Sequence, residues 1–148
     1  MLQWKDGNFR AFGLSFSIPD GCYLDLEEKR MTENGVTIWT SNEKYRIDID
    51  ILNSSVYEPI EDWLKELLST DDILTILSPA QPLVMNGLTG CEIFYSIGNS
   101  GDYYYEARFS RPNGNGIIFL VSGEDKSILN IKREPEVLFS LNSISAYK

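Results

Sequence analysis

The sequence contains no histidine and only two cysteines among its 148 residues. Without histidine, the chain cannot build the Ser–His or Cys–His pairs that activate many hydrolytic nucleophiles, and it lacks the commonest general base. It also lacks the imidazole ligands of most zinc sites, and two cysteines far apart in sequence do not replace them. We therefore nominate no catalytic residue, no metal site and no cofactor, and we expect a protein that is not an enzyme.

Basic side chains are also scarce. The chain has 13 Lys and Arg against 22 Asp and Glu, which gives a formal net charge of −9. Nucleic-acid binding depends on neutralising phosphates with Lys and Arg, so we do not expect a nucleic-acid partner. A negative surface is complementary to a basic protein, although the same charge also serves to keep a protein in solution.

Long apolar runs are missing from the start of the chain. Residues 1–12 include several charged side chains and read as neither a signal peptide nor a transmembrane anchor. We therefore expect no membrane insertion, and a cytoplasmic location in which Cys22 and Cys91 are both reduced. A leader removed before Met1 would instead place the protein outside the cytoplasm, where a Cys22–Cys91 bridge can form.

The rest of the composition is that of a folded domain. Apolar residues make up 43% and charged residues 24% of the chain, which are ordinary values for a globular protein. A chain of this length buries about two thirds of its unfolded surface, so its core needs neither a disulfide nor a metal. We expect residues 1–148 to form one domain and leave its oligomeric state open.

Alternation of apolar and polar residues predicts strands in the first third of the chain. The expected strands are 12–18, 22–26, 36–40 and 45–51. The clearest is 45–51, in which Ile47 and Ile49 point to one side while Asp48 and Asp50 point to the other. One buried sheet face is therefore specified.

The period then changes to that of a helix. Apolar residues recur at helical spacing over 60–68, and Pro59 suits the first helical position. We expect this helix to pack on the sheet, which accounts for Trp63 in its apolar stripe. A second helix is expected to begin at Pro135, with Leu138, Leu141 and Ile144 on one face.

The second half of the chain predicts a meander of three strands at 88–97, 103–110 and 116–122, with a tight turn at Asn86–Gly87 before them. Residues 78–82 carry two prolines and are expected to form a loop. The strand 116–122 is apolar on both faces and needs cover on both. The expected fold is α+β: a twisted antiparallel sheet covered by helices on both faces, which is an α/β/α sandwich.

Carboxylates on the polar sides of these strands are candidate binding residues. Asp48 and Asp50 share one strand, whereas Glu92 and Glu106 lie on neighbouring meander strands, with Arg108 two residues beyond Glu106. If these faces coincide, the side chains can form an acid/base pair or an oxygen-ligand ion site. The alternative is a solvated or helix-covered sheet face with cross-strand ion pairs.

The three consecutive tyrosines divide between two faces of their strand. Tyr103 and Tyr105 share one face and are expected at the core or its edge. Tyr104 lies on the other face, and we expect Tyr104 and Phe94 to face a ligand groove, because an aromatic surface with a polar rim suits recognition.

Several segments resemble the PsbP-like superfamily: 16–21 at the start, the Trp-containing helix after four strands, 86–90 opening an aromatic meander, and 141–144 at the end. The resemblance spans nearly the whole chain and consists of packing and turn motifs. It implies an α/β/α sandwich used chiefly to bind other macromolecules, and it carries over no catalytic residue. The DcrB-like lipoprotein members carry a leader and a lipidation cysteine, which residues 1–12 do not show, and we therefore do not expect an envelope role.

Two functional hypotheses follow. The first is a non-enzymatic protein-binding or adaptor domain whose partner is another protein, basic or secreted. The alternative is a small-ligand-binding protein or an unrecognised enzyme that uses a groove lined by carboxylates and Tyr104. A structure without a concave pocket beside those residues would remove the basis of the second hypothesis.

Overall fold

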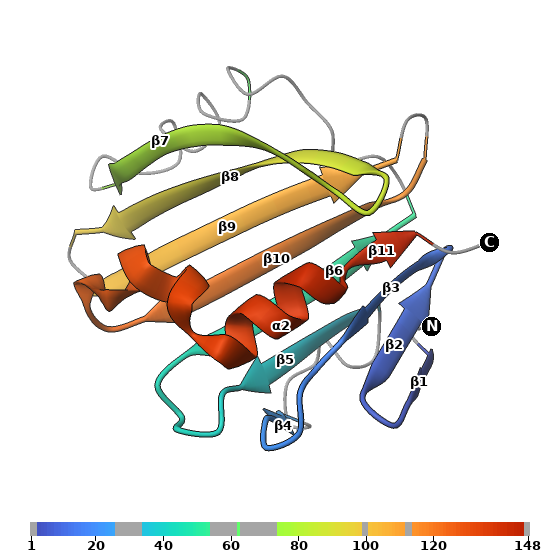
Figure 1. Cartoon of the computed structure of the whole chain (residues 1–148). Coiled ribbons are helices and arrows are strands. Elements are labelled where there is room, and N and C mark those ends of the chain that lie inside the picture. Colours follow the sequence, from blue (N-terminus) through green and yellow to red (C-terminus); the bar gives the residue numbers. More distant parts are fainter. Residues whose placement is uncertain are drawn as a thin grey trace.

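The structure is a computed structural model, which describes residues 3–25, 34–53, 62, 74–98, 101–111 and 114–146. These residues form two sheets and a helical layer (Figure 1). The larger sheet has seven strands in the order β4-β5-β6-β10-β9-β8-β7, and the smaller has four in the order β1-β2-β3-β11. Neighbouring strands in both sheets are antiparallel.

The four-stranded sheet consists of β1 (Gln3–Lys5), β2 (Asn8–Ala11), β3 (Leu14–Ser17) and β11 (Ser145–Ala146). The seven-stranded sheet consists of β4 (Tyr23–Leu24), β5 (Gly35–Trp39), β6 (Arg46–Leu52), β7 (Leu74–Met85), β8 (Leu88–Ile97), β9 (Asp102–Ser110) and β10 (Gly116–Gly123). The helical layer consists of η2 (Lys126–Arg133), which is a 3₁₀ helix, and α2 (Pro135–Ser143).

The predicted meander is confirmed, because β8, β9 and β10 are consecutive antiparallel neighbours. The tight turn before it has positive φ angles of 49° at Asn86 and 81° at Gly87, as a two-residue hairpin turn requires. In β10 the side chains of Ile117, Phe119 and Val121 are fully buried. This strand therefore lies at the centre of the core.

The predicted strand at 12–18 is wrong at its first residues. The chain turns at Phe12 and Gly13, whose φ angles are 50° and 79°, so that β2 and β3 form a hairpin. The carbonyl oxygen of Phe12 accepts hydrogen bonds from Arg111 Nη2 at 2.7 Å and from the side chain of Asn115. These long-range contacts stabilise a turn conformation that phenylalanine seldom adopts by itself.

The predicted loop at 78–82 is also wrong, since β7 continues through both prolines. This strand is at the edge of its sheet, where a missing N–H removes no bond to an outer neighbour. The pairing of β7 with β8 shifts register between Ile76 and Ser78 and again between Ser78 and Gln81. The irregular ladder accommodates the prolines without ending the strand.

The helices η2 and α2 lie across one face of the seven-stranded sheet (Figure 1). As predicted, α2 begins at Pro135. Its buried face, however, includes Val137 and Leu141, while Leu138 is 36% exposed. The helix predicted at 60–68, which is the cover expected for the opposite face, lies outside the described residues apart from Asp62.

The described residues thus form an α+β fold dominated by antiparallel sheet. In the part of the chain that the structure describes, no helix has the length and apolar character needed to cross a membrane.

Candidate functional site

The register of the central strands sorts the predicted site residues onto two faces. Phe94 pairs with Tyr105, whereas Ile93 pairs with Glu106. Because side chains alternate along a strand, Phe94 and Glu92 lie on the face covered by η2 and α2. The opposite side is called the polar face here, and it carries Arg46, Asp48, Asp50, Tyr104, Glu106 and Arg108.

One predicted association is therefore wrong, and the condition set for another is not met. Phe94 does not share a groove with Tyr104, because adjacent strands place these two side chains on opposite faces. For the same reason, Glu92 does not lie beside Glu106. The ring of Phe94 instead packs against Tyr105, with 4.8 Å between ring centroids.

Glu92 belongs to a buried polar cluster under the helical layer. Its carboxylate accepts a hydrogen bond from Tyr105 Oη at 2.5 Å and one from the ammonium of Lys132. Burial, together with the hydrogen bond to Glu92, raises the pKa of Tyr105. These contacts join η2 to the sheet and do not form a ligand site.

The carboxylates of the polar face are engaged with neighbouring side chains. Glu106 accepts from Tyr95 Oη at 3.0 Å and from Arg108 Nε at 2.6 Å. Burial and the negative charge of Glu106 raise the pKa of Tyr95. Both oxygens of Glu106 are therefore engaged by neighbouring side chains.

Asp48 is held in a similar way. Its carboxylate accepts from Thr37 Oγ1 across the strand pair at 2.6 Å and lies 3.2 Å from Arg46 Nε. Asp50 lies over Gly35, where an added Cβ would collide with its carboxylate. Among the described residues, no group of three or more Cys, Asp or Glu side chains is arranged to hold a metal ion.

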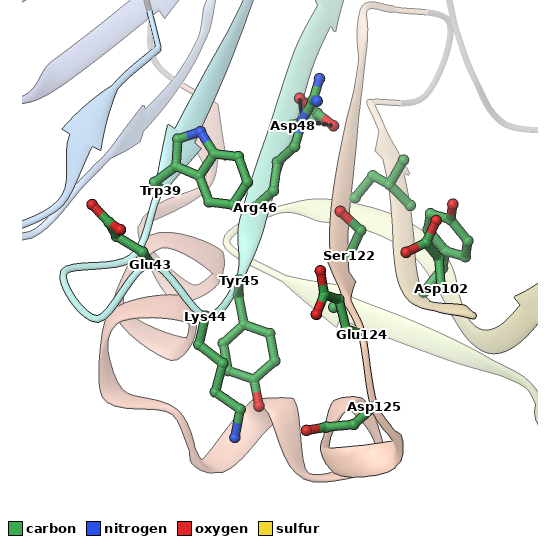
Figure 2. Close-up of a pocket in the computed structure, with 13 residues that line it drawn as sticks. Trp39, Glu43, Lys44, Tyr45, Arg46, Asp48, Asp102, Ser122, Glu124 and Asp125 are labelled. Carbon is green, nitrogen blue, oxygen red and sulfur yellow. Dashed lines mark hydrogen bonds and ion pairs between the residues drawn. The ribbon is translucent and has the colours of Figure 1, made fainter. Parts of the chain in front are cut away.

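A pocket of about 530 Å³ lies where β6 begins and β10 ends, on and beyond the polar face (Figure 2). Of the predicted site residues, Tyr104 and Asp48 line it. The full lining consists of Trp39, Glu43, Lys44, Tyr45, Arg46, Asp48, Asp102, Tyr104, Leu120, Ser122, Gly123, Glu124 and Asp125.

The pocket floor is a row of paired residues across four strands. Trp39 of β5 pairs with Arg46 of β6, Arg46 pairs with Ser122 of β10, and Ser122 pairs with Tyr104 of β9. All four therefore point to the polar face. Because the small Ser122 lies between Arg46 and Tyr104, the row is hollow at that strand.

Aromatic side chains form the two sides of this row. The ring of Tyr104 stacks on Tyr95 with 5.2 Å between centroids and 19° between planes. Burial and the charge of Asp102 raise the pKa of Tyr104, although Arg46 opposes this. Tyr104 therefore presents a neutral phenol at neutral pH. On the other side, Trp39 donates from Nε1 to Asp25 at 3.3 Å, which fixes the position of its indole.

The end of the pocket is formed by Tyr45, whose ring points towards the helical layer in Figure 2. Its Oη is 2.6 Å from Ser127 Oγ in η2. A Cβ on Gly123 would lie 3.1 Å from the ring, so a residue larger than glycine would crowd the Tyr45 side chain. Asp125 caps η2 by accepting from the Ser127 amide at 2.8 Å.

Negative charge predominates around the pocket. Its five carboxylates belong to Glu43, Asp48, Asp102, Glu124 and Asp125, and its two cations to Lys44 and Arg46. In a concave site this excess raises the local concentration of cations. The arrangement can therefore hold a positively charged group between aromatic sides.

Sequence reasoning missed most of this lining, including Trp39, Arg46, Asp102 and Glu124. Arg46 and Asp102 each lie two residues from a nominated residue, Asp48 and Tyr104, so strand alternation could have added them to the same face. The register that aligns Trp39 with them has no comparable signal in the sequence.

No protein-family model matches the sequence. No curated protein matches it either. The structure is similar to cyanobacterial PsbP (CyanoP) from Synechocystis, with 13% identity, a TM-score of 0.61, and coverage of 91% of this chain and 87% of that one.

It is also similar to LpqN of Mycobacterium tuberculosis, with 11% identity, a TM-score of 0.60, and coverage of 91% and 83%. A protein of unknown function from Pseudomonas aeruginosa matches with 11% identity, a TM-score of 0.52, and coverage of 92% and 93%. At these identities the likeness concerns architecture, and the chain has the PsbP-like fold.

Proposed function

We propose that the protein is a non-enzymatic binding module that holds a basic segment of another protein in this pocket. The observation that carries the proposal is the pocket lining, in which five carboxylates and two cations surround a hollow at Ser122. A Lys or Arg side chain placed there would lie among carboxylates and beside Trp39 and Tyr104. Cations over aromatic faces gain about 0.5–2 kcal/mol.

The charge of the whole chain supports the same partner. A net charge of −9 attracts a basic protein from a distance and raises its association rate. The pocket then provides the specific contact for the partner, between Trp39 and Tyr104, which come from the strands on either side of β6 and β10.

The hydrogen bonds that hold the carboxylates of the polar face favour a binding role over a catalytic one. Asp48 and Glu106, the two buried carboxylates of the polar face, each accept hydrogen bonds from two neighbouring side chains. The chain also has no histidine to act as a general base.

The proposal is tested by titrating the purified protein with three peptides of equal length, one rich in Lys and Arg, one rich in Glu and one neutral. We expect only the basic peptide to bind, with an affinity that falls as salt is added. Absence of binding by the basic peptide, or equal binding of all three, overturns the proposal.

A pair of matched variants localises the binding. Asp102→Asn with Glu124→Gln removes two charges from the pocket, and we expect Kd to rise about tenfold. Asp6→Asn with Asp20→Asn removes two charges from exposed turns outside the pocket, and we expect less than about a twofold change at physiological salt. Equal losses of affinity in both variants would show that binding depends only on the overall charge of the protein and not on the pocket.

A small organic cation is the second candidate ligand. The pocket volume of about 530 Å³ lies within the range of small-molecule sites, roughly 300–1,000 Å³. Titration with arginine amide separates the two candidates. Binding as strong as that of the basic peptide would favour the small cation.

We propose a cytoplasmic location for the protein. Cys22 packs at the edge of the main core and Cys91 in a separate cluster, so this fold does not bring the two thiols together. LpqN is involved in cell envelope biogenesis, which makes an extracytoplasmic location the alternative. Fractionation of cells that express the natural gene with a tag distinguishes them.

A further inference from the structure

One wall of the pocket is hydrogen-bonded to the helical layer on the other face of the sheet. Residues 40–45, called the pocket turn here, join β5 to β6 and supply Glu43, Lys44 and Tyr45 to the lining. Ser41 donates to Glu136 Oε1 of α2 twice, from its amide at 3.0 Å and from its hydroxyl at 2.8 Å.

The second oxygen of Glu136 is also engaged. Oε2 accepts from the thiol of Cys22 at 3.2 Å. The contacts of the two oxygens fix the carboxylate between the end of the β3–β4 connection and the pocket turn. Hydrogen bonds from Ser41 and Cys22 lower the pKa of Glu136, although burial opposes them. The carboxylate is therefore charged at neutral pH.

The pocket turn has its own internal bonds, so it behaves as a unit. The hydroxyl of Thr40 donates to Asn42 Oδ1 at 2.6 Å, the Lys44 amide donates to the same oxygen at 3.0 Å, and the Glu43 amide donates to the Thr40 carbonyl at 2.8 Å. These bonds connect Ser41 to the residues of the turn that line the pocket.

We propose that Glu136 is a positioning residue for the pocket, which holds the pocket turn in its binding shape through Ser41. The inference rests on the proposed function, since it names a residue that determines the shape of the same pocket. Glu136 does not line the pocket. It acts from the helical layer, so that the position of α2 and the shape of the pocket are coupled.

The test compares Glu136→Ala, Ser41→Ala and the double variant in titrations with the basic peptide. We expect Kd to rise about tenfold for Glu136→Ala and about threefold for Ser41→Ala, which keeps its amide bond. The double variant should match Glu136→Ala alone, because the hydroxyl contact that Ser41→Ala removes is already lost in Glu136→Ala. Fully additive effects, or an unchanged Kd in Glu136→Ala, overturn the inference.

Asn86→Ala is the matched control for a general loss of stability. Asn86 Nδ2 donates to the carbonyl oxygens of Asn142 at 3.1 Å and Ile144 at 2.7 Å, which ties the other end of α2 to the β7–β8 turn. We expect this variant to lower Tm without changing Kd. If it weakens the peptide as much as Glu136→Ala does, the role of Glu136 is only structural.

A measurement on the ligand-free protein separates this inference from the proposed function. Glu136→Ala should shift the amide NMR signals of residues 41–45 and speed the alkylation of Cys22, whose pKa burial and Glu136 raise to about 12. Asn86→Ala should do neither. If no peptide binds but these changes occur, the proposed function fails while Glu136 still positions the turn. If the signals of 41–45 do not move, the inference fails.

Discussion

Lys132 in η2 donates from its ammonium to Glu92 in β8, 40 residues earlier in the chain. The contact lies on the sheet face opposite the pocket, where Tyr105 donates to the other oxygen of the same carboxylate. Lys132 Nζ also lies 5.9 Å from the centre of the Tyr105 ring. These three side chains form one polar connection between η2 and the core of the sheet.

Loss of the Lys132 ammonium should destabilise the fold. In Lys132→Met the carboxylate of Glu92, whose side chain is only 10% exposed in the parent protein, loses one of its two hydrogen bonds and keeps the one from Tyr105. The Lys132 side chain is 40% exposed, so solvent screens part of the interaction, and we expect a loss of about 1–2 kcal/mol in the free energy of unfolding.

Urea unfolding measures this loss. Lys126→Met, which changes an exposed lysine of the same 3₁₀ segment, should stay within about 0.5 kcal/mol of the parent protein. Equal destabilisation by the two substitutions would contradict a specific role for the Lys132–Glu92 pair.

Stability should fall at alkaline pH. Burial, with the neighbouring carboxylates, raises the pKa of Tyr95 and Tyr105 above 10.0 and that of Cys22 from 9.0 to about 12. The folded protein therefore keeps these protons more tightly than the unfolded chain, which loses them first as the pH rises. The stabilisation is complete below about pH 9 and is lost progressively above it.

Urea unfolding between pH 7 and 10.5 tests this dependence. The free energy of unfolding should decrease above about pH 9, and the decrease should be shallower in Tyr105→Phe, which has no phenol proton to lose. A flat profile up to pH 10.5 in the parent protein would show that these groups are not held as described.

The meander was predictable because local signals agreed with one another. Asn86–Gly87 suits the positive φ angles of a two-residue turn, and strand alternation on both sides of it specifies which residues are buried. The turn at Phe12 gave no such signal, because it depends on Arg111 and Asn115, about 100 residues away. The continuity of β7 was hidden in the same way, since an edge position becomes known only from the complete sheet order.

The candidate site was only partly predictable for a related reason. Alternation placed Asp48 and Tyr104 on the polar side of their strands, but it could not show whether the meander strands put Glu92 and Glu106 on one face. The register decides this question, and it separates them. The hollow at Ser122 also arises from register, which sets a small side chain between Arg46 and Tyr104.

Filling that hollow should remove binding without unfolding the protein. Ser122→Leu places a branched side chain in the pocket floor, and we expect at least a tenfold rise in the Kd of the basic peptide. Ser122 is partly exposed, so the expected change in stability is small, about 1 kcal/mol or less.

Thr89→Leu enlarges an exposed position of β8 outside the pocket and serves as the control for Ser122→Leu. It should leave Kd unchanged in the same titration. Retention of full affinity by Ser122→Leu would mean that the ligand does not enter the pocket.

The most direct test of the account is to map the binding of the basic peptide by NMR on the isotope-labelled protein. We predict that the largest shifts on titration occur at Trp39, Arg46, Asp102, Tyr104 and Ser122, which meet around the pocket. Largest shifts on the exposed side of the helical layer, at Leu138 and Phe139, or no saturable shifts at all, would contradict the account.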